Sequence, residues 1–202
     1  VSSDDKNLYV SWTSFDTDKE TADLYVESYS LNKKKNWSFK QWNTILGWVI
    51  FAIAFVTYLS TIEHNFSFWD TGEYIASATK LEVTHAPGAA LFQLVGAVAA
   101  MFAFGNGENY SIVINAMSAL FSAVTVLLLF WIITHLVRRL LNKDFNEITK
   151  HQEIAILFAG AIGALSFTFS DTFWFSAVEG EVYSMATMFI ALLLWLITKW
   201  EN

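Results

Sequence analysis

Apolar residues gather along the chain in long segments that polar and acidic turns separate. These segments cover residues 44–61, 88–105, 111–137, 154–170 and 182–200. A helix of about 20 mostly apolar residues can cross a bilayer, and no charged side chain lies between Lys40 and Glu63. The pattern therefore predicts a bundle of membrane-spanning helices.

The segment 88–105 differs from the other four because it is rich in alanine and glycine and carries fewer bulky side chains. Its apolar residues recur at helical spacing and predict one stripe, made of Leu91, Phe92, Val95, Val98, Ala99 and Phe102. This pattern favours a helix that lies in the membrane interface, although a tightly packed spanning helix with small residues would look the same.

The positions of lysine and arginine favour four spans over five. Basic residues beside a span mark its cytoplasmic side, and they occur at 33–40 and 138–150. If 88–105 does not cross, both groups lie on the cytoplasmic side, together with Lys199. The acidic stretches around Asp70 and Glu179 then share the outer face, whereas five spans would place them on opposite faces.

Composition agrees with this class. Of the 202 residues, 54% are hydrophobic and 15% are charged, whereas soluble domains carry about 25% charged residues. We therefore expect an all-α polytopic membrane protein with about four transmembrane helices and an interfacial helical outer loop. The sequence contains no cysteine, which excludes disulfides, and no basic surface for nucleic acid is evident.

The first part of the chain, residues 1–35, is polar and forms an extension to the apolar region 36–202. Two runs of strand-like composition, KNLYVSWTSF and ADLYVESYSL, lie on either side of the turn-rich DTDKET. This arrangement predicts either a hairpin or an unstructured extension.

The stretch FWDTGEY places two carboxylates, Asp70 and Glu73, three residues apart and therefore on one face of a helix. Trp69 and Tyr74 beside them are typical of the membrane–water boundary. A carboxylate that apolar rings partly desolvate is a stronger base. A solvated acidic loop would show the same spacing, so the pattern alone leaves both interpretations open.

Two further features supply candidate polar groups. His85 lies in the turn THAPG, before Pro87. A histidine there can bind phosphate or carry protons, although a histidine alone in such a turn is more often an ordinary surface or core residue. In the stretch SDTFWFSAVEGEVYSM, which we expect to be an outer loop, acidic residues again flank aromatic ones. Asn115, inside an apolar segment, predicts a hydrogen bond to a neighbouring helix.

Taken in order, these features resemble the N-terminal part of the GT-C glycosyltransferases, which are polytopic enzymes that use lipid-phosphate-linked sugars. The shared order is a span, an acidic motif just outside it, a His-x-Pro turn, a membrane-hugging helix and a long span that ends in basic residues. Within that superfamily the chain is most similar to the protein O-mannosyltransferase-like branch, glycosyltransferase family 117.

Three stretches carry the closer resemblance: FWDTGEYIASATKLEVTHAPGA, NAMSALFSAVTVLLLFWIITHL and WFSAVEGEVYSM. The branch typically has F-W-D-C-G-E-F and H-P-P-G, so Thr71, Tyr74 and Ala86 depart from it, and none of these departures removes an ionisable group. The resemblance covers residues 37–202. Members of the branch are larger and carry more spans, so turnover by this piece alone is left open.

The resemblance implies an enzyme that moves a sugar, expected to be mannose, from a polyprenyl-phosphate donor to a hydroxyl acceptor, a protein Ser/Thr side chain or a glycan. Asp70 would be the general base, and Glu73 would be the second acid, which positions Asp70 or the acceptor. The residues that would contact substrates are His85, Trp69, Glu179, Glu181 and Tyr183. This chemistry requires no cofactor, although some GT-C enzymes use a divalent metal, which leaves a metal open.

The expected location is a bacterial inner membrane, with the active site facing the periplasm. The expected partners are the polyprenyl-phosphate sugar, an acceptor polypeptide or glycan and the lipid bilayer, with no nucleic acid. Two other classes stay open. Acidic groups at membrane edges also serve ion pathways in transport proteins, and a non-catalytic membrane assembly subunit would use the same loops to bind a partner.

Overall fold

The computed structural model describes residues 2–3, 7–16, 21–30, 38–65, 67, 69–86, 88–141 and 148–200. The chain forms two compact units, residues 1–38 and 39–202. Pro87 lies outside the described residues, so its predicted effect on the turn stays a prediction.

The N-terminal unit is a small antiparallel sheet. Its strands are β1 (Ser2–Ser3), β2 (Asn7–Asp16) and β3 (Thr21–Ser30), in the order β1-β2-β3. The hairpin pairs Asn7 with Ser30 at one end and Asp16 with Thr21 at the other. The strands are paired by hydrogen-bonded ladders in an antiparallel register, and cross-strand side-chain pairs stabilise such a sheet.

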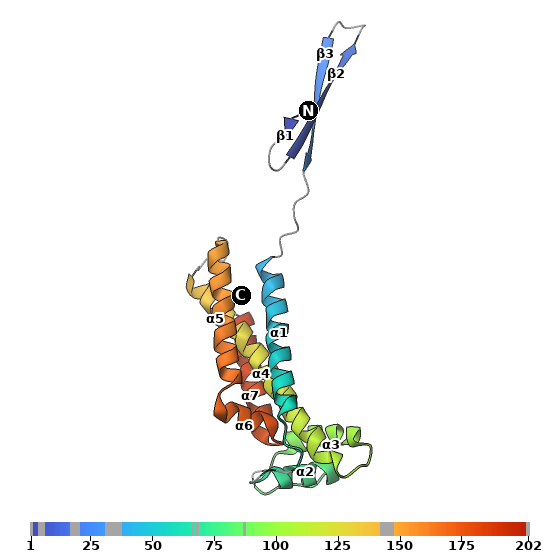
Figure 1. Cartoon of the computed structure of the whole chain (residues 1–202), viewed down its shortest axis with the longest axis vertical. Coiled ribbons are helices and arrows are strands. Elements are labelled where there is room, and N and C mark those ends of the chain that lie inside the picture. Colours follow the sequence, from blue (N-terminus) through green and yellow to red (C-terminus); the bar gives the residue numbers. More distant parts are fainter. Residues whose placement is uncertain are drawn as a thin grey trace. The chain divides into compact units, whose positions relative to one another are not determined.

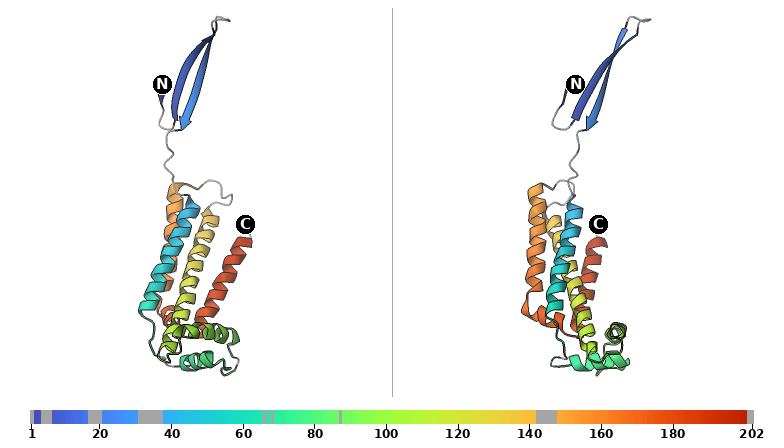
Figure 2. Two further views of the ribbon diagram at one scale, coloured as in Figure 1. Left: turned by 90° about the vertical axis from the view of Figure 1, so that its right-hand side faces the viewer. Right: turned by 45° about the vertical axis from the view of Figure 1, so that its right-hand side comes forward.

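The second unit is all-α in its described residues, as the sequence predicts. Its helices are α1 (Phe39–Ser60), α2 (Thr71–Lys80), α3 (Ala90–Ala100), the 3₁₀ turn η1 (Met101–Ala103), α4 (Asn109–Leu141), α5 (Lys150–Thr168), α6 (Asp171–Val178) and α7 (Val182–Trp200). The four long helices α1, α4, α5 and α7 run side by side, and α2, α3 and α6 lie across one end of them (Figures 1 and 2).

Three of these helices, α1, α4 and α7, are long and apolar enough to cross a membrane on their own. Helices α5 and α6 pass the same test only as a pair that is bent by 65°. The described residues therefore contain three candidate spanning helices, or four if the bent pair is one span. The 33-residue helix α4 lies at the centre of this bundle and packs against α1, α5 and α7.

The bend after α5 corrects the predicted extent of the fourth apolar segment. The sequence predicts a span over 154–170 followed by a loop, but the helix ends at Thr168 and a second helix begins at Asp171. Phe173 and Ala177 of α6 are buried in the core, and the Phe167 and Phe173 rings pack with centroids 4.2 Å apart. Phe173 of the expected loop is thus a core residue, whereas Phe175 and Tyr183 remain exposed.

Helix α3 does not cross the bundle. Its 11 residues span about 17 Å at 1.5 Å per residue, which is roughly half the hydrocarbon thickness of a bilayer. The chain also returns to where it started: Ser111 Oγ at the start of α4 donates to the His64 carbonyl just beyond α1 at 2.7 Å. Segment 61–110 therefore begins and ends at the same end of the bundle.

Asn115 makes the second tie between these segments, because its side-chain nitrogen donates to the Glu63 carbonyl at 2.6 Å. The sequence predicts that Asn115 bonds to a neighbouring helix, but its partner is a carbonyl in the loop after α1.

The exposed face of α3 also differs from the predicted stripe. Phe92 is buried against α2 and α4, and Gly96 allows this packing because a Cβ there would lie 2.9 Å from the Ala78 Cβ. The apolar side chains that remain exposed at helical spacing are Leu91, Leu94, Val98 and Phe102. Helix α3 therefore has two apolar faces: one packs on α2 and α4, and the other is exposed. The predicted single stripe is wrong in joining residues from both faces.

Gly160 sets the distance between α5 and α4. A Cβ there would lie 2.5 Å from the Thr134 Cγ2 atom and 2.9 Å from the Phe130 ring, and both of these residues are buried. We expect Gly160→Ala to lower the free energy of unfolding by about 1–3 kcal/mol through overpacking, seen as a lower thermal unfolding temperature of the full-length protein in detergent.

Gly163→Ala is the matched control, because a Cβ there meets only the end of the Ile133 side chain, which can move. Equal unfolding temperatures for both variants would contradict the close approach of α4 and α5.

Candidate active site

The backbone before α2 presents Asp70 at the start of that helix. Trp69 has φ of +67°, a left-handed conformation that costs a bulky residue about 1–2 kcal/mol. Asp70 follows as the N-cap residue, and its side chain makes no capping hydrogen bond. Most N-cap aspartates use their carboxylate to accept from the helix backbone. The Asp70 carboxylate is instead left available at the surface.

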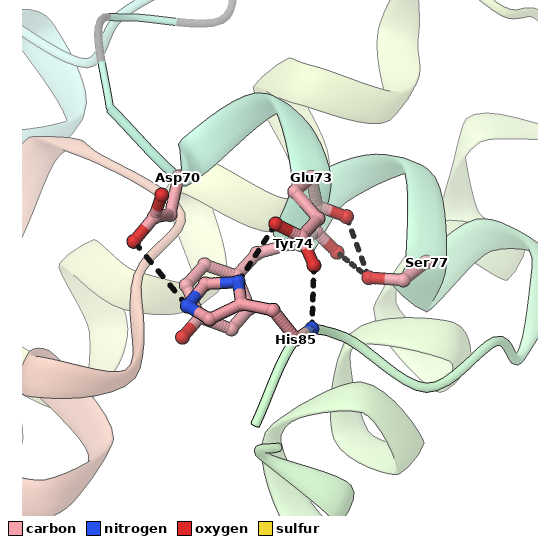
Figure 3. A network of polar contacts seen from close by, with 5 residues as sticks. All are labelled: Asp70, Glu73, Tyr74, Ser77 and His85. Atoms are coloured by element: carbon pink, nitrogen blue, oxygen red, sulfur yellow. Dashed lines mark hydrogen bonds and ion pairs between the residues drawn. The ribbon is translucent and has the colours of Figure 1, made fainter. Parts of the chain in front are cut away.

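Glu73, one turn into α2, is fully engaged by His85. Its Oε1 atom accepts from the His85 backbone N–H at 2.7 Å, and its Oε2 atom lies 2.8 Å from the His85 Nδ1 atom. Figure 3 shows the imidazole between the two carboxylates, with Nδ1 directed at Glu73 and Nε2 at Asp70. Glu73 therefore fixes both the position of the loop after α2 and the orientation of the histidine ring.

The second ring nitrogen of His85 lies 3.8 Å from the Asp70 Oδ2 atom. One donor atom from each of Asp70, Glu73 and His85 lies within 4.8 Å of the other two. Two carboxylates and an imidazole are a donor set that suits a divalent transition metal. Both Glu73 oxygens already bond to His85, so a metal would have to replace at least one of these bonds.

The Glu73–His85 contact shifts the pKa values of both residues. The pKa of Glu73 is lowered, first by the His85 backbone N–H and then by the ring. The pKa of His85 is raised, first by its hydrogen bond to Glu73 and then by the charge of Glu73, with a smaller contribution from Asp70. Both shifts favour a charged pair.

Tyr74 supports the histidine from behind (Figure 3). Its ring lies 6.4 Å from the imidazole and 5.7 Å, edge to face, from Phe92 of α3. Burial raises the pKa of Tyr74, and the charges of Asp70 and Glu181 raise it further. Tyr74 therefore stays neutral and gives His85 an apolar surface that α3 holds in place.

The structure joins the second acidic stretch to the first through Thr71. The Thr71 hydroxyl donates to Glu181 Oε1 at 3.2 Å and accepts from the Ser67 hydroxyl at 3.3 Å. Thr71 is fully buried. The sequence pattern marks Thr71 only as a departure from the family motif and predicts neither hydrogen bond. No local pattern could link Thr71 with Glu181, which lies 110 positions away.

Glu179 and Glu181 lie in the short turn between α6 and α7. Glu179 is 4% exposed, and burial is the main reason why its pKa is raised; a hydrogen bond with Ser67 partly offsets the rise. Burial also raises the pKa of Glu181, and Asp70 adds to it by charge repulsion. The two glutamates thus border the first cluster from the protein side.

The two aromatic candidates lie at the edge of this site. Trp69 is 86% exposed and Tyr183 is 60% exposed. Among the described residues, neither side chain forms a hydrogen bond or an ion pair with the cluster. Their exposure leaves them accessible to substrate or lipid, and their predicted substrate contacts stay a prediction.

The sequence that carries this site matches a known protein family. Residues 70–202 match the model of the protein O-mannosyl-transferase TMEM260 N-terminal domain, so that the match begins at Asp70 and includes the whole cluster. The chain belongs to the TMEM260 N-terminal domain family. The predicted relation to the protein O-mannosyltransferase-like branch of the GT-C superfamily is confirmed.

Two relatives in this TMEM260 family are much longer than the region that matches this chain. The chain is 29% identical to the mouse (Mus musculus) protein O-mannosyl-transferase TMEM260 over 154 residues, 76% of the chain and 19% of the relative. It is 26% identical to the Dictyostelium discoideum protein O-mannosyl-transferase tmem260 over 148 residues, 73% of the chain and 16% of that relative. The chain thus matches less than a fifth of either relative. No solved structure matches it.

The pair of Glu73 and His85 predicts a defined pH dependence. Its contribution to local stability is fully present at pH values below the ordinary histidine pKa of 6.5 and above the ordinary glutamate pKa of 4.5. It is lost as pH rises through the raised pKa of His85, or falls through the lowered pKa of Glu73. Glu73→Gln should therefore lower the pKa of His85, measured by NMR of isotope-labelled histidine.

Glu82→Gln is the control, because this exposed neighbour does not contact His85. A His85 pKa that is the same in Glu73→Gln as in the parent protein would contradict the contact.

Proposed function

We propose that the longer protein to which this chain belongs is a glycosyltransferase that transfers mannose from a polyprenyl-phosphate donor to Ser/Thr hydroxyls of a polypeptide. The arrangement of Asp70, His85 and Glu73 carries the proposal. Glu73 is occupied by His85, so Asp70 is the carboxylate of this cluster that remains open to a substrate. The relatives' names, which state protein O-mannosyl transfer, support the reaction class.

In the proposed reaction, the acceptor oxygen attacks C1 of the sugar as Asp70 takes the hydroxyl proton. The new C1–O bond forms while the bond between C1 and the donor phosphate oxygen breaks, and the lipid phosphate leaves with the electron pair. Phosphate is a good leaving group, so the protein has to supply mainly a base, positioning and stabilisation of charge. Side-chain carboxylates acting as bases typically contribute about 10²–10⁴-fold in rate.

His85 would supply the positive charge in this mechanism. Glu73 raises its pKa, which favours the imidazolium, and Glu73 also directs Nε2 toward Asp70. Because Nδ1–H is engaged by Glu73, the imidazolium has one free N–H, on Nε2, which holds Asp70 in place before the donor binds and can turn to the donor phosphate once it is bound. Glu73 would be a positioning residue that acts through His85, because both of its carboxylate oxygens contact that residue.

The distribution of charge supports an outer location for the site. The described acidic residues at the site end are Glu63, Asp70, Glu73, Glu82, Glu108, Asp171, Glu179 and Glu181. The described lysines and arginines at the other end are Lys40, Arg138, Arg139, Lys150 and Lys199; the exceptions are Lys80 at the site end and Glu153 at the other end. Because basic residues favour the cytoplasmic side, we propose that the acidic end faces outward, toward the periplasm if the membrane is a bacterial inner membrane.

Asp70→Asn tests the base. In the full-length protein, we expect this change to lower the rate of mannose transfer by about 10²–10⁴-fold, because Asn keeps the shape of the side chain and cannot take the proton. The measurement is transfer of labelled mannose from a polyprenyl-phosphate donor to a Ser/Thr peptide.

Glu108→Gln is the matched control, since it removes an exposed carboxylate at the same end and outside the cluster; we expect near-parent activity. Parent-level transfer by Asp70→Asn would exclude Asp70 as an essential base.

Single cysteines test the orientation, because the chain has no cysteine of its own. Gly107 lies beside the site end, with nothing within 4 Å of a Cβ placed there, and Lys150 begins α5 at the other end. We expect a membrane-impermeant thiol reagent added to intact cells to label Gly107→Cys and not Lys150→Cys. The reverse pattern would place the site inside, and labelling of both would contradict a single orientation.

A further inference from the structure

A cavity with basic residues in its lining lies at the end of the bundle opposite the candidate active site. It has a volume of about 490 Å³ and opens where the first turns of α1 meet the last turns of α4 and α7. Its lining includes Lys40 and Asn43 of α1, Arg138 of α4, and Trp195 and Lys199 of α7. This cavity is separate from the proposed reaction because the length of the helices lies between the two.

Three positively charged side chains, one from each helix, converge on this cavity. Its lining contains no acidic residue in the described part of the chain. The Phe39 ring helps to hold Arg138 in place, because the guanidinium carbon lies over it, 4.9 Å from the ring centroid. Lys40 and Lys199 remain exposed. A cavity with this charge is complementary to an anionic group.

Aromatic rings form the wall of the cavity nearer the bundle centre. The Trp131 and Trp195 rings lie with their centroids 6.0 Å apart, and the Lys199 ammonium lies 5.6 Å from the Trp195 ring. The Trp131 indole N–H donates to the Asn43 carbonyl at 3.4 Å, which ties α4 to α1. Tryptophan rings are typical of the level at which lipid headgroups meet acyl chains.

The depth of the cavity decides between a soluble anion and a lipid. All three helices reach their ends here after apolar runs long enough to span a bilayer, so the lysines lie at the membrane surface and the tryptophans just below it. Basic pockets between spanning helices on the cytoplasmic side suit anionic lipid headgroups. The Asn43 side-chain oxygen, which is buried without a hydrogen-bond partner in the structure, adds an acceptor for a headgroup hydroxyl.

We propose that this cavity, formed by Lys40, Arg138, Lys199 and the Trp131–Trp195 pair, binds the phosphate of an anionic phospholipid such as phosphatidylglycerol. The phosphate contacts the cations, the glycerol hydroxyls lie near Asn43, and the acyl chains pass the tryptophan rings into the bilayer. Three separate helices are then held together at the end that lies far from the active site.

The test is lipid binding to the purified full-length protein in detergent, with bound lipid counted by native mass spectrometry. Phosphatidylglycerol should bind in preference to phosphatidylcholine of the same chain length. Because each lysine of the cavity would donate a charge-assisted hydrogen bond to the phosphate, the double variant Lys40→Gln/Lys199→Gln should bind phosphatidylglycerol about 30-fold more weakly.

Lys150→Gln is the matched control, since it removes a lysine at the same end that does not line the cavity; we expect its affinity to stay at the parent value. If affinity for phosphatidylglycerol fell by the same factor per lysine in the control and in the cavity variant, the lipid would be attracted only by the general surface charge, and the site would be overturned. Two other results would also overturn it: equal binding of the two lipids, or full competition by millimolar inorganic phosphate, which would assign the cavity to the free anion. Thermal unfolding without added lipid verifies that all variants fold.

Discussion

The fully buried carboxamide of Asn115 is the contact on which the acidic end of the bundle depends. Its nitrogen donates to the Glu63 carbonyl at 2.6 Å and, more weakly, to the Asn65 carbonyl at 3.5 Å. On its other side, Gly180 packs so closely that a Cβ would lie 2.9 Å from the Asn115 oxygen. One side chain in α4 thereby fixes the loop after α1 and the turn before α7. Without it, the loop would lose the hydrogen bond to the Glu63 carbonyl, which contributes about 0.5–1.5 kcal/mol.

This joint explains why a cluster of acids can persist beside apolar helices. A Cβ added at Gly180 would also lie 3.5 Å from the Ile75 side chain of α2. Helix α2, the glutamates around Gly180 and the loop after α1 are therefore packed around one point. Repulsion among the carboxylates is reduced in two ways: His85 lies between Asp70 and Glu73, and burial raises the pKa values of Glu179 and Glu181.

Local sequence pattern was enough to predict the long helices and one feature of the site. The apolar runs indicated the helices, and the spacing of Asp70 and Glu73 placed two carboxylates at one helix start. The features that could not be predicted depend on contacts between distant residues. The double contact of His85 with Glu73 needs the loop after α2 to fold back, the Thr71–Glu181 bond joins two separate turns, and α6 forms a helix because Phe173 and Ala177 find a buried surface. In α3, the pattern showed apolar residues but not which of them would meet α2.

The Thr71–Glu181 hydrogen bond couples the tilt of a long helix to the open carboxylate. Glu181 immediately precedes α7, and Thr71 immediately follows Asp70, so the two ends of this bond belong to elements that would otherwise move separately. A change in the angle of α7 displaces Glu181 and either strains the bond, which is 3.2 Å long, or carries the first turn of α2 with it. Helix α7 is about 28 Å long for its 19 residues. A small tilt at its far end would therefore be transmitted through Glu181 and Thr71 to the position of Asp70.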